Sequence, residues 1–116
     1  MKKNEELAVI SQTYDLVLWT VNHTSRFPRQ HRHVLGDRIE RHLYDILENL
    51  IEAKYLRQRG DLLERVNRQL EKLRFLLRLS KDLKCLEVTS YGYGAKCVDE
   101  IGRQVGGWLR SSGAPT

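Results

Sequence analysis

The chain has 116 residues, fewer than the length at which one hydrophobic core normally divides, so the sequence predicts a single domain over residues 1–116. Apolar residues make up 41% and charged residues 30%, with only 2 prolines, which provides material for a core and excludes collagen-like and low-complexity chains. The 20 Lys and Arg residues outnumber the 15 Asp and Glu residues, giving a net charge of +5 and a pI near 9.4. This balance favours a polyanion or an acidic protein face as the partner.

Cysteine usage and the absence of a long apolar run predict where the protein resides. Cys85 and Cys97 are the only cysteines, too few for a disulfide framework or a zinc set, which is typical of reduced core thiols in an intracellular protein. No apolar run approaches the roughly 18 residues that span a bilayer, and the start of the chain is charged. We therefore expect a cytoplasmic protein with neither a signal peptide nor a membrane span.

The first predicted helix covers about residues 4–24. Its expected buried stripe, in steps of three or four residues, consists of Leu7, Ile10, Tyr14, Val17 and Val21. Asn4 is expected to cap this helix. Trp19 points away from the stripe together with Leu16, and apolar bulk exposed on a second face suggests an interface between copies of the chain.

The next two predicted helices cover about residues 28–58 and 61–86. Pro28 suits the first position of a helix, and the second helix is expected to bury Leu35, Ile39, Leu43, Ile46, Leu50 and Ala53. Gly60 is expected to stop this helix and Asp61 to cap the next one. The third helix has a wide predicted apolar face, made of Leu62, Val66, Leu70, Leu73 and Leu77, then of Leu76, Leu79, Leu83 and Leu86.

A fourth helix is predicted over about residues 89–110, although five glycines lower its helix propensity. Its apolar stripe runs through Tyr91, Ala95, Val98, Ile101, Val105 and Trp108. Gly102 and Gly106 could let a second chain approach closely beside Trp108, or Trp108 could simply be the last core residue. Residues 111–116 should fray. Because no segment alternates like a strand, we predict an all-α fold, an antiparallel up-down four-helix bundle that forms a homo-oligomer.

No arrangement of residues predicts catalysis or cofactor binding. The four histidines lack ligand spacing for a metal, Cys85 and Cys97 have no redox-motif spacing, and no nucleophile–base set or carboxylate pair stands out. The residues 90–96 include two glycines but lack the strand and the Lys-Ser/Thr ending of a phosphate-binding loop. The sequence thus predicts a protein that is not an enzyme and carries no metal or cofactor.

Basic residues on the second and third predicted helices are the strongest sign of function. Arg74, Arg78 and Lys81 step by four and three residues, which places them on one ridge where guanidinium groups can meet phosphates or carboxylates. The expected binding residues are Arg41, Arg68, Lys72, Arg74, Arg78 and Lys81. The alternative is a solvated helix face that only keeps the protein soluble.

Three sequence stretches carry a resemblance to a known family. They are Phe27-Pro28 followed by Leu35-Gly36, the run from Leu73 to Leu79 (Leu-Arg-Phe-Leu-Leu-Arg-Leu), and Ile101-Gly102-Arg103 followed by Gly106-Gly107-Trp108. With these stretches the chain, from about Leu7 to Leu109, resembles the four-helix-bundle family of the accessory variability determinant (Avd) of diversity-generating retroelements and of the proteins encoded in 23S ribosomal RNA intervening sequences.

The resemblance implies both an assembly and a function. The assembly is a homopentameric barrel with a basic surface and a tapered central channel. In the Avd branch the protein is a non-catalytic partner of a reverse transcriptase and of the template-repeat RNA, and supports mutagenic cDNA synthesis. Arg74 and Arg78 match the basic positions of the third helix in this family. The intervening-sequence branch, a structural or assembly module, is the alternative, because the shared motifs do not separate the two branches.

Overall fold

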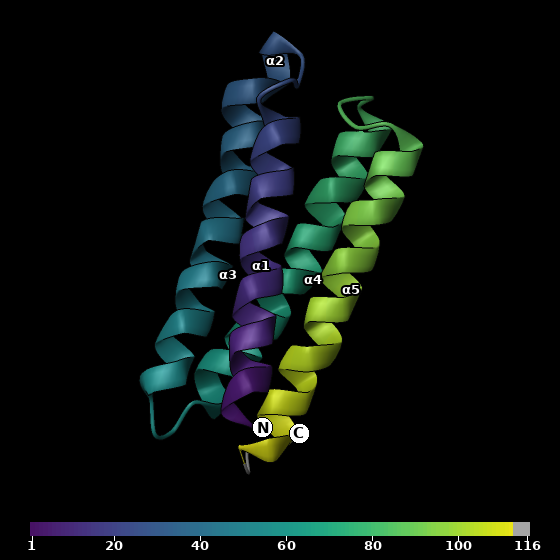
Figure 1. Cartoon of the computed structure of the whole chain (residues 1–116). Helices are drawn as coiled ribbons and strands as arrows, with labels where there is room; N and C mark the ends of the chain where they lie inside the picture. The colour runs from purple at the N-terminus through teal and green to yellow at the C-terminus, as the bar shows by residue number, and fades with distance from the viewer. Residues whose placement is uncertain (113–116) are drawn as a thin grey trace.

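Four long helical segments make up the part of the chain that the structure, a computed structural model, describes, residues 1–112 (Figure 1). Their elements are α1 (Lys3–Thr24), α2 (Arg29–His31), the π-helical turn η1 (Arg32–Gly36), α3 (Asp37–Tyr55), α4 (Gly60–Asp82) and α5 (Val88–Ser111). No strand occurs among these residues, which confirms the all-α prediction. The principal extents are 44 × 23 × 22 Å, and the start of α1 and the end of α5 lie at the same end of the molecule (Figure 1).

None of the helices within residues 1–112 combines the length and the hydropathy that a membrane span requires. The end of the chain differs in part from the expectation of a frayed segment. Ser111 still belongs to α5 and Ser112 caps this helix, while residues 113–116 of the expected frayed tail lie outside the described residues.

The buried face of α1 differs from the predicted one. Its buried residues are Val9, Thr13, Leu16, Thr20 and Thr24. Leu7 and Tyr14 of the predicted stripe are exposed instead. The prediction was wrong because threonine was treated as polar, whereas the Thr13 hydroxyl donates to the Val9 carbonyl 2.8 Å away and leaves its methyl group to pack. Leu16, expected on an outer face, is therefore a core residue. The expected Asn4 cap is also absent, since α1 begins at Lys3 with no side-chain cap.

The second helical segment contains a π-helical turn that no sequence pattern predicted. η1 leads directly into α3, whose buried residues include the predicted Ile39, Leu43 and Ile46. The predicted core positions Leu35, Leu50 and Ala53 are buried too. α3 ends at Tyr55 instead of residue 58, because Leu56 adopts an extended backbone with ψ of 140°.

The connection between α3 and α4 is longer than expected. Gly60 begins α4 instead of ending the preceding helix, and Asp61 lies in the first turn without a side-chain capping bond. The backbone N–H of Leu63 donates to the Arg59 carbonyl at 2.9 Å. Leu63 consequently takes the buried position that was predicted for Leu62, which is only half-buried.

α4 ends four residues earlier than predicted, at Asp82, in a turn stabilised by its own backbone. The N–H of Cys85 donates to the Ser80 carbonyl at 2.8 Å, and the N–H of Lys84 donates to the Lys81 carbonyl at 2.9 Å. These two bonds define a Schellman motif, in which Lys84 adopts the left-handed backbone with φ of 63°. Leu79 and Leu83, expected in the apolar face, are exposed.

α5 forms an uninterrupted helix despite its glycines, because its apolar residues pack into the core. Val98, Ile101, Val105 and Trp108 are all buried, as predicted. Trp108 is only 1% exposed, which confirms the alternative that it is a core residue. Packing against α4 and α1 thus compensates for the weak helix propensity of this segment.

Candidate functional site

Three of the predicted binding residues lie on the side of α4 that faces α5. Arg74 forms an ion pair with Asp99 of α5 and approaches Glu71 at 3.8 Å. Arg78 lies 4.0 Å from Asp82, one turn further along α4. Each of these guanidinium groups has a carboxylate partner in its own chain, yet both side chains keep exposed surface, 42% for Arg74 and 61% for Arg78.

Lys81 completes this side of α4. Its ammonium group lies 3.4 Å from an Asp82 oxygen and 4.9 Å from the centre of the Tyr91 ring. A cation over an aromatic ring is held by the negative face of the ring, so Lys81 ties the end of α4 to the start of α5. We call Arg74, Arg78 and Lys81 the α4–α5 ridge.

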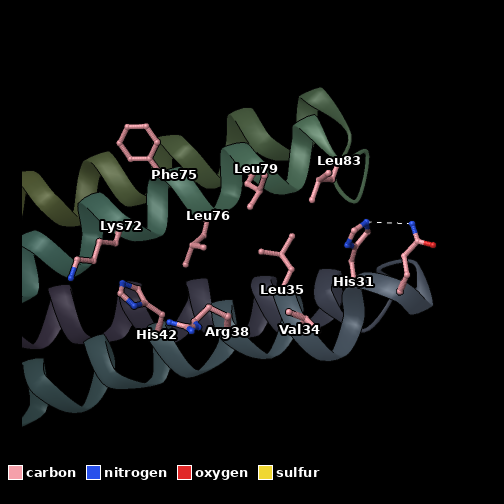
Figure 2. Close-up of a pocket in the computed structure, with 11 residues that line it drawn as sticks. His31, Val34, Leu35, Arg38, His42, Lys72, Phe75, Leu76, Leu79 and Leu83 are labelled. Atoms are coloured by element: carbon pink, nitrogen blue, oxygen red, sulfur yellow. Dashed lines mark hydrogen bonds between the residues drawn. The ribbon is translucent and has the colours of Figure 1, made fainter.

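A groove of about 740 Å³ separates α4 from the second helical segment on the opposite side (Figure 2). Most of its wall is apolar, and the eleven residues that line it are Gln30, His31, Val34, Leu35, Arg38, His42, Lys72, Phe75, Leu76, Leu79 and Leu83. Leu79 and Leu83 project into it from α4, and Val34 and Leu35 from η1 (Figure 2). We call it the α3–α4 groove.

The polar residues of the α3–α4 groove are basic or neutral. Arg38 and Lys72 contribute cationic groups from its two walls, and His31 and His42 contribute imidazoles. The ring nitrogen Nε2 of His42 donates to the Gln69 carbonyl oxygen at 2.6 Å, which links α3 to α4 across the floor. None of the eleven side chains that line the groove within residues 1–112 carries a carboxylate, so the charged groups of its lining, those of Arg38 and Lys72, are both cationic.

The six predicted binding residues therefore fall into two groups. Arg74, Arg78 and Lys81 form the α4–α5 ridge. Lys72 belongs to the α3–α4 groove, and Arg68 is exposed one turn before it on α4. Arg41 is exposed on α3, three residues after the groove residue Arg38. A single extended ligand would have to cross the exposed edge of α4 to reach both groups.

Of the residues predicted to form an interface between copies, Gly102 and Gly106 belong to α5 and Trp19 packs against this helix. The indole ring of Trp19 is half-buried and packs on Gly94 of α5, with the rings of His23 and Tyr93 centred 4.2 and 5.5 Å away. A methyl group added at Gly102 would lie 4.0 Å from Leu70, and one added at Gly106 would lie 3.5 Å from Arg110. Both glycines are half-buried. Trp19 thus already has a partner within its own chain.

Three titratable groups in or beside α5 have pKa values shifted by their surroundings. The Arg103 guanidinium donates to the Glu100 carboxylate and holds the pKa of Glu100 below its usual range. Burial raises the pKa of the Cys85 thiol, and a hydrogen bond with Cys97 raises the pKa of Tyr93. Within residues 1–112, no three His, Cys, Asp or Glu side chains cluster as a metal site would require. These groups form no recognisable catalytic arrangement.

Several groove residues were absent from the predicted binding set. Arg38 and Val34 line the groove but were not among the predicted binding residues. A signal did exist, since Phe75, Leu79 and Leu83 repeat every four residues on α4 outside the central stripe of Leu70, Leu73 and Leu77. Leu79 and Leu83 were predicted to belong to a wide buried face, whereas both are exposed at the groove together with Phe75.

Comparison with known proteins identifies the family. Among curated proteins, none matches the sequence. The sequence profile of one family, described as bAvd-like, matches residues 7–112, which is nearly the whole chain and agrees with the resemblance to Avd. The chain belongs to the bAvd-like family, a family of Avd-type accessory proteins.

Proposed function

We propose that this chain is a non-catalytic accessory protein of a diversity-generating retroelement, which binds the reverse transcriptase and the template-repeat RNA and supports mutagenic cDNA synthesis. Membership of the bAvd-like family is the observation that carries the proposal. The net charge of +5 supports an RNA partner, since cationic side chains that neutralise phosphates release counterions.

The α4–α5 ridge is the proposed contact surface for RNA or for the polymerase. Exposed ion pairs contribute little to stability, so a phosphate can replace Asp82 or Glu71 as the partner of a guanidinium at small cost. The guanidinium of Arg78, one turn from Arg74, is the more exposed of the two. Arg68, Lys72 and Arg41 extend the proposed basic surface around α4 and onto α3.

The proposed assembly is a homopentamer of antiparallel up-down bundles in the cytoplasm. Ring closure would repeat the ridge once per copy, so that weak phosphate contacts add through multivalency. Trp19, Gly102 and Gly106 remain the proposed interface residues from the sequence. Light scattering of the purified chain tests the assembly, since a pentamer has about five times the monomer mass of 13.6 kDa.

Reconstitution with the polymerase tests the function. The tagged chain is co-expressed with the retroelement reverse transcriptase and the template-repeat RNA, and both are measured in the purified complex. The variant R74Q/R78Q should lose most of the RNA, the polymerase or both. The variant R103Q is a matched control, since Arg103 is an exposed arginine of α5, outside the ridge, that pairs with the Glu100 carboxylate of the same helix. Unchanged retention of both partners by folded R74Q/R78Q would refute the role of the ridge.

A structural or assembly module, like the proteins encoded in ribosomal RNA intervening sequences, is the second candidate. It is favoured by one specific observation: Arg74, Arg78 and Lys81 each have a carboxylate partner within the chain, which a merely solvated face also explains. Under this alternative the oligomer forms normally, while neither RNA nor polymerase is retained by the wild-type chain.

A further inference from the structure

The α3–α4 groove exposes a large apolar surface that nothing in its own chain covers within residues 1–112. Val34 is 76% exposed and Phe75 is 57% exposed, and Leu79 and Leu83 are exposed beside them. Contiguous apolar surface of this kind marks a site of protein contact. The basic residues Arg38 and Lys72 on its two walls select an occupant that brings carboxylates together with apolar side chains (Figure 2).

The chain itself carries such a surface on α3. Steps of three or four residues place three carboxylates and three apolar side chains on one face of α3, on which Glu40 is half-buried and the others are exposed. We call this face the α3 stripe: Asp37, Glu40, Tyr44, Glu48, Ile51 and Tyr55. Tyr44, Ile51 and Tyr55 are exposed, the last by 75%. The carboxylate of Glu40 accepts hydrogen bonds from Tyr44 and from Thr24 of α1, which fixes Glu40 and Tyr44 at the start of the stripe.

The α3 stripe is longer than the groove wall. At the helical rise of about 1.5 Å per residue, the α3 stripe from Asp37 to Tyr55 is about 27 Å long. The groove wall on α4 from Lys72 to Leu83 is about 16 Å long by the same measure. The stripe can therefore cover the full length of the groove.

A chain cannot place its own stripe in its own groove. His42 lines the groove and Tyr44 lies on the stripe, and two residues correspond to about 200° of rotation around the helix. The two surfaces thus point in different directions from α3. Two grooves also cannot pair with each other, because both carry positive charge from Arg38 and Lys72.

We infer that the α3–α4 groove receives the α3 stripe of a second copy of this chain. The contact is heterologous: the groove of each copy accepts the stripe of the next, and carboxylates of the stripe face the basic residues of the groove. This inference rests on the proposed homo-oligomer and identifies the two surfaces that form its interface. These surfaces differ from the interface residues proposed from the sequence, Trp19, Gly102 and Gly106. Repetition of this contact covers both exposed surfaces in every copy.

Complementary variants test the inference by light scattering at one protein concentration. The groove variant K72E/F75E and the stripe variant E48K/I51K each change only exposed residues, so both should fold, as circular dichroism will verify. Each variant alone should fall from the wild-type oligomer mass to the 13.6 kDa monomer. Mixed together they should form a complex of at least two chains, since each retains the surface that the other has lost. The control V88K changes an exposed apolar residue at the start of α5 and should keep the wild-type mass.

The outcomes separate the two proposals. A wild-type chain that is itself a monomer would refute the proposed oligomer, and the groove assignment with it. A wild-type oligomer that persists in either double variant would refute the groove assignment alone. A mixture in which both variants remain monomers would also refute it. Should either double variant fail to fold, the single reversals K72E and E48K, which keep the apolar residues, must each lower the average mass at the same concentration, and an unchanged mass would overturn the inference.

Discussion

The contact between Trp19 and Gly94 makes a sharp prediction about two neighbouring glycines of α5. A methyl group at Gly94 would lie 2.9 Å from Cη2 and 3.0 Å from Cζ3 of the Trp19 indole, and 3.4 Å from Leu77. Real side chains do not approach this closely, so Gly94→Ala must displace the indole ring or separate α5 from α1. Gly92 lies two residues earlier in the same helix, and a methyl group there would have no atom within 4 Å.

Gly92→Ala and Gly94→Ala both gain stability from the higher helix propensity of alanine, but only Gly94→Ala also loses stability through a steric clash. Alanine is better than glycine in a helix by about 0.8–1 kcal/mol, and Gly92→Ala should gain up to this amount of unfolding free energy. Gly94→Ala gains the same amount but overfills a packed site, which costs about 1–3 kcal/mol. We therefore expect Gly94→Ala to be neutral or destabilising by up to about 2 kcal/mol, and less stable than Gly92→Ala by about 1–3 kcal/mol.

Urea unfolding at one fixed protein concentration measures both effects, since stability depends on concentration when the chain self-associates. The substitution Trp19→Phe removes the outer indole atoms that crowd position 94, so in that background Gly94→Ala should become stabilising. Equal stability of Gly92→Ala and Gly94→Ala would contradict the packing of Trp19 against α5. So would a Gly94→Ala effect that Trp19→Phe leaves unchanged.

Three further substitutions test the core, a helix end and a hydrogen bond. Leu73 is 1% exposed on the central stripe of α4, so Leu73→Ala should lower the free energy of unfolding by about 2–5 kcal/mol. A decrease below about 1 kcal/mol in urea unfolding would contradict the burial of Leu73. Lys84→Gly should raise the unfolding free energy by about 1 kcal/mol, because glycine adopts the positive φ of the Schellman turn without strain; a lower melting temperature would argue against that turn. Burial and the hydrogen bond to Glu40 raise the pKa of Tyr44, so its phenol should ionise above the usual tyrosine range in an ultraviolet titration. The pKa of Tyr44 is higher in the folded state than in the unfolded state, so the hydrogen bond stabilises the fold at neutral pH and this stabilisation is lost as pH rises through the folded-state pKa. Tyr44→Phe should therefore lower the free energy of unfolding by about 0.5–1.5 kcal/mol at neutral pH and have no effect at alkaline pH. A loss of stability that is the same at every pH would contradict the assigned hydrogen bond.

The sequence was sufficient to predict the buried face of a helix where the buried residues are aliphatic. Leu70, Leu73 and Leu77 repeat at helical spacing and are all buried, as predicted. In α1 the same reasoning selected the wrong face, because Thr13 and Thr20 occupy buried positions that a hydropathy pattern assigns to solvent. The Thr13 hydroxyl is satisfied by the Val9 carbonyl one turn earlier, whereas the buried Thr20 hydroxyl has no hydrogen-bond partner among the described residues, so hydropathy did not predict either burial.

The site was less predictable than the fold because it depends on contacts between helices. The spacing of Arg74 and Arg78 placed them on one side of α4, but their register against Asp99 of α5, 25 residues away from Arg74, is a tertiary property. The α3–α4 groove depends on η1, a π-helical turn without a sequence signature, which positions Val34 at the groove. Such features follow from packing, which local patterns do not encode.

The salt dependence of RNA retention tests the central claim, that the basic surface of this Avd-type protein contacts nucleic acid, most directly. The affinity of the folded wild-type chain for template-repeat RNA is measured across a series of salt concentrations, beside R74Q/R78Q and the control R103Q. Each lost phosphate contact removes about one unit from the slope of log K against log salt, so the double variant should lose up to about two units while R103Q keeps the wild-type slope. A wild-type chain that binds no RNA, or a slope that is the same in all three proteins, would contradict the claim.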